Sequence, residues 1–355
     1  MTTPRSVPVG KTPAQPTRTA QPTPHKVPLQ LDVVEPQPKT ELKIDNGTRS
    51  TEPTMPKIKL KATVTVQGQP VSIGTIRWEF HVKGTYRVRI TLSTYRMQPY
   101  DLPAGNVETA PGEEKEFTLA PELVVGGELV VKASYTGGAE VGGASVTKTV
   151  AGCKVTGQPL DRAESTAYIV SQAGSLAWLF LRMFYVETEM HPYQQFLNGM
   201  PWYGDPAGVG CVQRDPEPGE WTFPKDAVGT PNKLFPKIFW NWKRNVEEGI
   251  RYFNEVKLGY GRSDVASLRR AHPKLPDPPE ALIDRAGIRR YNGGVEYSSA
   301  DGLHYQAPAH AGKDYADKVV HASPPEAAPY PVPDDALVRV WPVDPPPAPG
   351  KKPKG

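Results

Sequence analysis

The sequence contains little cysteine, and this limits the kinds of site that it can hold. Its 355 residues include two cysteines, Cys153 and Cys211, too few for a disulfide framework or a four-cysteine zinc site. The seven histidines are scattered, with no His-x-x-x-His spacing, and no Cys-x-x-Cys pair is present. We therefore expect neither a metal site nor a bound cofactor.

Long apolar runs are also missing. The longest, from Leu176 to Val186, contains Arg182 and is much shorter than the roughly 20 residues that span a bilayer. The first residues, MTTPRSVPVG, lack the apolar region of a secretory signal peptide. We expect a buried helix and no stable membrane insertion, and we expect any export to use a route other than a Sec signal.

Neither sign of charge is in large excess. The 42 lysines and arginines against 38 aspartates and glutamates give a formal net charge of +4. Nucleic-acid-binding proteins concentrate positive charge because they neutralise many phosphates. The balance therefore predicts no nucleic-acid partner.

Proline is abundant instead, and it gathers at both ends of the chain. The sequence has 41 prolines, more than twice the usual share of about 5%. Residues 1–56 are rich in Pro, Thr, Gln and Lys and offer few apolar groups to offset the entropy of ordering. We expect a disordered, Pro-rich tether over 1–56 and a Pro-rich basic tail over 324–355.

Residues 57–156 show the period-two alternation of half-buried strands. Turn-like residues separate the alternating runs at 68–70, 83–84, 103–105 and 126–127. About seven short strands in about 100 residues are typical of an immunoglobulin-like β-sandwich. The apolar residues expected to face its core are Ile58, Leu60, Ala62, Val64, Val66, Trp78, Phe80, Val82, Tyr86, Val88, Ile90, Leu129, Val131, Ala133 and Tyr135.

Residues 157–323 have helical periodicity. We expect helices over 160–172, 175–187, 242–256, 279–291 and 314–322, with Asp161 and Ser175 as N-caps of the first two. Irregular Gly- and Pro-rich loops fill 198–238. The chain is therefore expected to be multidomain, an all-β sandwich followed by a mostly α-helical domain.

One carboxylate stands out at the end of the most apolar helix. Glu187 follows a surface of Trp, Leu, Phe and Met, and such surroundings favour the protonated form of a carboxylic acid. A protonated acid near neutral pH is what a glycosidic leaving oxygen requires. Glu189 is the rival for this role, and an ordinary solvated glutamate at a helix end is the alternative.

Further motifs follow Glu187 in a defined order. They are Gln195-Phe196, Gly208-Val209-Gly210-Cys211-Val212-Gln213, the segment Trp240 to Val246, Arg290-Tyr291-Asn292-Gly293-Gly294, and Tyr315 to Val319. Together with the Glu187-Thr188 pair, this order resembles the lysozyme-like, soluble lytic transglycosylase family over about residues 165–322.

The resemblance implies a function and a set of site residues. The substrate would be peptidoglycan glycan strands, cleaved at the bond between N-acetylmuramic acid and N-acetylglucosamine by a single acid/base, Glu187. The substrate's own C6 hydroxyl, or a water, would attack. Glycan would be bound by Gly210, Gln213, Tyr291, Asn292 and Trp240.

The interval between Glu187 and Gln195-Phe196 is longer than the family pattern, so the choice between Glu187 and Glu189 stays open. A second carboxylate from Asp205 or Asp215 is also open. The alternative function is a non-catalytic glycan-binding or structural component of a phage or secretion assembly. A wall enzyme delivered by such an assembly would explain the missing signal peptide.

Overall fold

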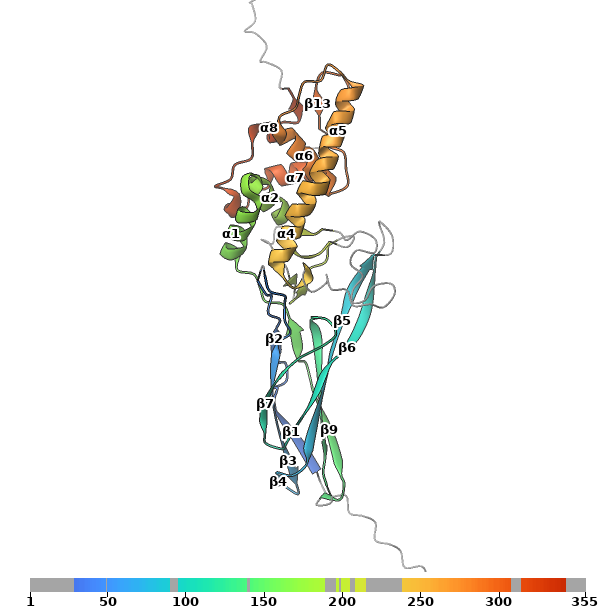
Figure 1. The fold of residues 1–355 in the computed structure, drawn as a ribbon, viewed down its shortest axis with the longest axis vertical. Coiled ribbons are helices and arrows are strands. Elements are labelled where there is room, and N and C mark those ends of the chain that lie inside the picture. Colours follow the sequence, from blue (N-terminus) through green and yellow to red (C-terminus); the bar gives the residue numbers. More distant parts are fainter. Residues whose placement is uncertain are drawn as a thin grey trace, which may run out of the picture.

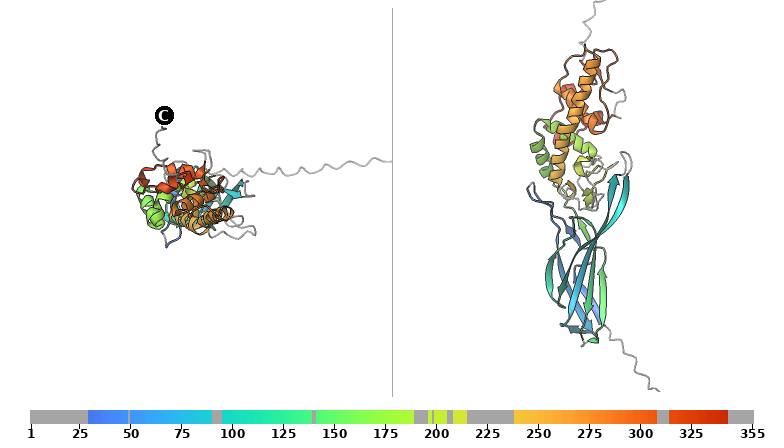
Figure 2. Two further views of the ribbon diagram at one scale, coloured as in Figure 1. Left: turned by 90° about the horizontal axis from the view of Figure 1, so that it is seen from above. Right: turned by 45° about the vertical axis from the view of Figure 1, so that its right-hand side comes forward.

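The molecule is elongated, with a β-rich region at one end and a helical region at the other (Figure 1, Figure 2). The computed structural model describes residues 29–48, 50–89, 95–138, 141–188, 196–197, 199–204, 208–214, 238–307 and 314–342. Strands give way to helices between Thr156 and Arg162. The chain therefore has a sheet-rich N-terminal region followed by a helical one.

Two sheets pack face to face in the β-rich region. In the first, β3 pairs with β1, β4 and β7; the second has the order β2-β10-β8-β5-β6, with β9 also paired to β8. All pairings are antiparallel except that of β10 with β2. The strands are β1 Leu29–Glu35, β2 Glu41–Lys43, β3 Lys57–Val66, β4 Gln69–Val71, β5 Thr75–Arg89, β6 Tyr95–Thr109, β7 Glu114–Thr118, β8 Gly127–Thr136, β9 Ser145–Val150 and β10 Lys154–Thr156.

The predicted alternation is confirmed in β3 from Ile58 to Val64, in β5 from Ile76 to Val82 and in β8 from Leu129 to Tyr135, where every second residue is buried, whereas Val66 is half-buried. Phe80 of β5 stacks on Phe117 of β7 with ring centroids 5.1 Å apart, which joins the two sheets. Side chains at 86–90 lie outside the described part. The buried residues of these strands are Ile58, Leu60, Ala62, Val64, Ile76, Trp78, Phe80, Val82, Leu129, Val131, Ala133 and Tyr135.

Two predicted turns are wrong. β5 continues through Gly84, and β6 continues through residues 103–105. Gly84 packs directly under the Tyr100 ring, where a side chain would collide. Gly105 has φ +110° and lies where the β5–β6 register shifts; a Cβ at this position would lie 2.7 Å from the Phe117 ring. These glycines permit close packing and a β-bulge, which composition alone does not distinguish from a turn.

The expected tether and tail are wrong in part, because both ends of the described chain contain ordered elements. β1 pairs along β3, and β2 pairs with β10. After residue 324 come a 3₁₀ turn η5 (Pro325–Ala327), α8 (Asp334–Leu337) and β14 (Val340–Trp341), which pairs with β13 (Tyr305–Gln306). Single apolar residues in these segments are buried in the core and hold the segments in place, namely Leu31, Ile44, Ala327 and Ala336.

The helical region contains the expected helices, but the one expected over 242–256 continues through a π-helical turn into α5, a helix over Leu258–Ala271 that was not predicted. Asp161 caps α1 by accepting from the Glu164 amide at 2.7 Å, as predicted. Ser175 is not a cap, because it lies inside a 3₁₀ turn. The elements are α1 Arg162–Ala173, η2 Gly174–Leu176, α2 Ala177–Glu187, β11 Phe196–Leu197, β12 Met200–Pro201, η3 Gly210–Val212, α4 Trp242–Tyr252, the π-helical turn η4 Phe253–Lys257, α5 Leu258–Ala271, α6 Glu280–Tyr291 and α7 Tyr315–His321.

One helical stretch, Arg162–Glu187, is long and apolar enough to cross a membrane by length and composition. More than half of its most apolar window (56%) is buried inside the protein. Core helices of globular domains can be equally long and apolar. We therefore interpret α2 as the central helix of the helical core.

The two regions share a packed junction. Trp240 stacks on Phe196 at 5.6 Å between ring centroids and packs against Gly126 of the β-rich region. The side-chain Nδ2 of Asn241 donates to the Thr48 carbonyl at 2.9 Å. The core of the sheets therefore continues into the first loops of the helical region.

Candidate functional site

Glu187 is the last residue of α2, and its carboxylate is half-buried. The eight residues of α2 from Ala177 to Phe184 are all buried. The helix therefore runs through the core and ends at Glu187. The Thr188 hydroxyl donates to the Phe184 carbonyl at 2.9 Å and helps to end the helix. The Tyr315 hydroxyl, from the start of α7, donates to Glu187 Oε1.

Two tyrosines share the electrostatic environment of Glu187. Burial, and then the Glu187 charge, raises the pKa of Tyr315 well above its ordinary value. The same two causes raise the pKa of Tyr291 at the end of α6. Both phenols therefore stay protonated at neutral pH and act as hydrogen-bond donors.

Tyr291 connects Glu187 to the Gly-rich loop. Its hydroxyl donates to the Val212 carbonyl at 2.6 Å, directly before Gln213. Gly210 has φ +69° and donates to the Trp202 carbonyl at 2.8 Å. Loop, α6 and α2 thus meet at one place, so the structure brings Glu187, Tyr291 and the Gly210–Gln213 segment together.

The Gln213 side chain holds this loop. Its Nε2 donates to the Gly210 carbonyl at 2.6 Å, and its Oε1 lies against Gly204 and Gly208. The residue has a left-handed backbone with φ +48° and is half-buried. We had expected the amide to face a sugar; here its nitrogen is engaged within the loop.

Asn245 of α4, a residue not predicted to belong to the site, holds the loop in place. Its Oδ1 accepts from the Val212 amide at 3.3 Å, and its Nδ2 donates to the Val209 carbonyl at 3.1 Å. Gly249, one turn later, lets α4 approach closely, since a Cβ there would lie 2.7 Å from Val212. A polar residue on the buried face of an amphipathic helix was the sign that could have revealed Asn245.

An aromatic and cationic wall continues beyond Tyr291. The Arg214 guanidinium is buried and lies 4.2 Å from the centroid of the Tyr252 ring. Tyr252 in turn contacts Tyr291 edge-to-face, with centroids 6.3 Å apart. Arg214 also lies 3.6 Å from the Glu248 carboxylate. The wall is therefore built by α4 and α6 around the buried cation.

Other predicted residues lie elsewhere. Trp240 is 1% exposed and packs in the junction, so the expected sugar-stacking role is wrong. Asn292 is exposed at the C-cap of α6, where its backbone amide donates to the Arg289 carbonyl at 3.2 Å. Glu189, Asp205 and Asp215 lie outside the described residues.

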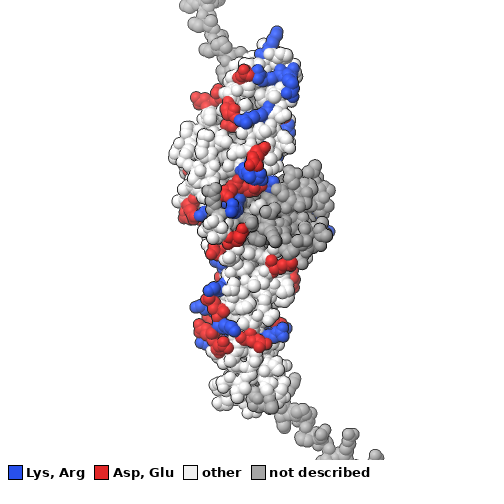
Figure 3. Space-filling model, in the orientation of Figure 1, with Lys and Arg blue, Asp and Glu red and all other residues white. Residues whose placement is uncertain are grey.

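The chemistry available at the site is that of a carboxylate with phenol and amide neighbours. Burial raises the pKa of the Cys211 thiol to about 12, which keeps it protonated and unreactive. Among the described residues, no group of three His, Cys, Asp or Glu could hold a metal ion. On the face in Figure 3, lysines and arginines are interspersed with acidic residues over both regions.

Comparison of the chain with protein-family models, with curated proteins and with solved structures gave no match in any of the three.

Proposed function

We propose that the chain cleaves peptidoglycan glycan strands, with Glu187 as the acid/base of a lysozyme-like helical domain that follows an immunoglobulin-like sandwich. The observation that carries the proposal is the placement of Glu187. It emerges half-buried from an apolar helix and accepts a hydrogen bond from a phenol that stays protonated. Tyr291, whose pKa the Glu187 charge helps to raise, donates a hydrogen bond to the Val212 carbonyl of the Gly-rich loop.

In the proposed reaction, protonated Glu187 gives its proton to the oxygen between N-acetylmuramic acid and N-acetylglucosamine as the C1–O bond breaks. The carboxylate then takes the proton of the C6 hydroxyl of the same muramic residue, whose oxygen bonds to C1 and forms an anhydro-sugar. If a water is deprotonated instead, the product is a reducing sugar. The Tyr315 hydrogen bond stabilises the carboxylate formed in the first step.

The same hydrogen bond supports a second candidate, a non-catalytic glycan-binding module in a phage or secretion assembly. A donor aimed at a carboxylate favours its ionised form, which cannot protonate a leaving group. An ionised Glu187 would instead accept hydrogen bonds from sugar hydroxyls.

The deciding experiment is mass spectrometry of the soluble fragments that the full-length protein releases from purified peptidoglycan. Glu187→Gln should release at least about a hundredfold less, because it removes the acid/base. The control, Glu255→Gln, makes the same change on an exposed residue of η4 and should behave as wild type. Loss on Glu189→Gln with retained activity of Glu187→Gln would reassign the acid.

Anhydro ends on the fragments would identify a lytic transglycosylase, and reducing ends a muramidase. No release by the wild type, with peptidoglycan still retained on the protein in a pull-down, would refute cleavage and establish the binding module.

A further inference from the structure

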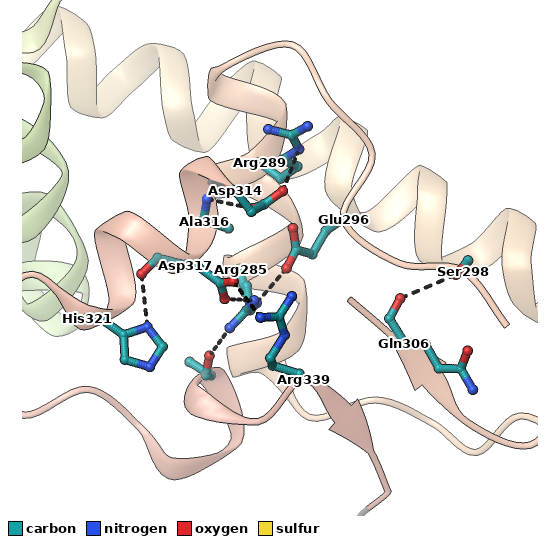
Figure 4. Close-up of polar contacts among 11 residues, drawn as sticks. Arg285, Arg289, Glu296, Ser298, Gln306, Asp314, Ala316, Asp317, His321 and Arg339 are labelled. Atoms are coloured by element: carbon teal, nitrogen blue, oxygen red, sulfur yellow. Dashed lines mark hydrogen bonds and ion pairs between the residues drawn. The ribbon is translucent and has the colours of Figure 1, made fainter. Parts of the chain in front are cut away.

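A buried ion-pair network joins α6 to α7 and to the segment after α8 (Figure 4). Arg285 of α6 has no exposed side-chain surface, and all three of its guanidinium nitrogens are engaged. Nε donates to Glu296 Oε1 at 2.6 Å, Nη2 to Asp317 Oδ1 at 2.5 Å, and Nη1 to the Ala336 carbonyl at 2.9 Å. The second oxygen of Asp317 lies 3.1 Å from Arg339 Nη1.

A second ion pair runs parallel to the first. Arg289, one turn after Arg285 on α6, places its Nε 3.3 Å from Asp314 Oδ2. Asp314 is also the N-cap of α7, since its Oδ1 accepts from the Ala316 amide at 2.8 Å. We call these two pairs the α6–α7 clamp; its residues are Arg285, Arg289, Asp314 and Asp317.

Two residues of the clamp, Asp314 and Asp317, flank Tyr315, the residue that contacts Glu187, in the sequence. Tyr315 follows Asp314 directly and precedes Asp317 by two positions, at the start of α7. On a helix this spacing turns Tyr315 away from the two aspartates, and α7 packs on α2 as well as on α6. One pair at the cap and one a turn later fix both the axial position and the rotation of α7.

We propose that the α6–α7 clamp positions the Tyr315 hydroxyl against the Glu187 carboxylate. Arg285 and Asp317 are then positioning residues. The effect on turnover rests on the proposed function. The effect on the ionisation of Glu187 does not, and it is measured separately.

The test uses three substitutions in the full-length protein. Asp314→Asn keeps the cap, because an amide oxygen accepts from the Ala316 amide equally well, and it removes only the charge opposite Arg289. Asp317→Asn removes the charge opposite Arg285. Tyr315→Phe removes the hydroxyl itself. The matched control is Asp335→Asn, the same change on an exposed residue of α8.

The readout is the titration midpoint of the Glu187 carboxyl, followed by ¹³C NMR and assigned with Glu187→Gln. Tyr315→Phe should move the midpoint up by about one pH unit, because a donor to the anion is lost. Both clamp variants should also move it up, and should add nothing in the Tyr315→Phe background. Asp335→Asn should match the wild type.

The sign separates positioning from simple electrostatics. Removing a nearby negative charge without moving Tyr315 would lower the midpoint, since it favours the carboxylate. A downward shift in the clamp variants, or no shift in a variant whose circular dichroism is native, would overturn the inference. If the wild type releases no glycan fragments while the midpoints shift up, the cleavage proposal fails and the positioning stands. In an active protein, kcat should fall severalfold with KM nearly unchanged.

Discussion

Asp284 gives the most direct quantitative test of the helical core. This aspartate of α6 is 6% exposed and lies near Glu280 and Arg262. Burial, and to a smaller extent the Glu280 charge, raises its pKa from 3.8 to about 6, although the Arg262 charge acts in the opposite direction. The unfolded chain therefore releases this proton at lower pH than the folded protein does.

The sign and size follow from linkage. Well below pH 3.8 Asp284 is protonated in both states and its burial costs no stability through ionisation. As pH rises toward 6 the unfolded state ionises first, so the folded state loses stability until both states are charged. About 2 pH units at 1.36 kcal/mol each give about 3 kcal/mol lost above pH 6.

The substitution Asp284→Asn removes this titration. The difference in unfolding free energy between variant and wild type should grow in the variant's favour by about 2–2.5 kcal/mol from pH 4 to pH 8. Urea unfolding followed by far-UV circular dichroism measures it, and taking the difference cancels the other titrating groups. Asp335→Asn, the same change on an exposed residue of α8, is the control. A pH-independent difference for Asp284→Asn would refute the reasoning.

Two further expectations concern close packing and burial. Gly249→Ala should destabilise the fold by about 1–3 kcal/mol, because its Cβ would press on Val212, whereas Gly259→Ala, in open space on α5, should stabilise it by about 0.5–1 kcal/mol. Urea unfolding compares the two, and equal effects would contradict the packing argument. Cys153 and Cys211 are buried and burial raises the pKa of both thiols, so neither should react with an aromatic disulfide reagent at pH 8 until guanidinium chloride unfolds the chain. Rapid labelling of the folded protein would show that a thiol is accessible.

The β-rich core could be predicted because period-two alternation directly records which face of a strand is buried. Trp78, Phe80 and Val82 illustrate this, since all three are fully buried as expected. The two wrongly predicted turns lie at glycines, because glycine is common both in turns and at close packing contacts inside strands. Gly84 and Gly105 permit close approach and a bulge inside long strands, and their partners, Tyr100 and Phe117, lie far away in the sequence.

The candidate site was predictable only where function coincides with a helix end. Glu187 and Tyr291 stand at the last positions of α2 and α6, where periodicity stops. Asn245 and Arg285 are different, because their roles depend on partners supplied by other elements. No local pattern encodes those pairings, and the Pro-rich composition after residue 324 concealed that Ala336 takes part in one of them.

The junction at Trp240 limits how this chain can be divided or recombined. A cut before residue 157 would separate the Asn241 side-chain amide from the Thr48 carbonyl, to which it donates at 2.9 Å, and would remove Gly126 from the ring of Trp240. Each fragment would expose an apolar surface prone to aggregation. A domain that replaced the β-rich region would need a surface that packs against the Trp240 indole as Gly126 does. The two regions are therefore expected to evolve together.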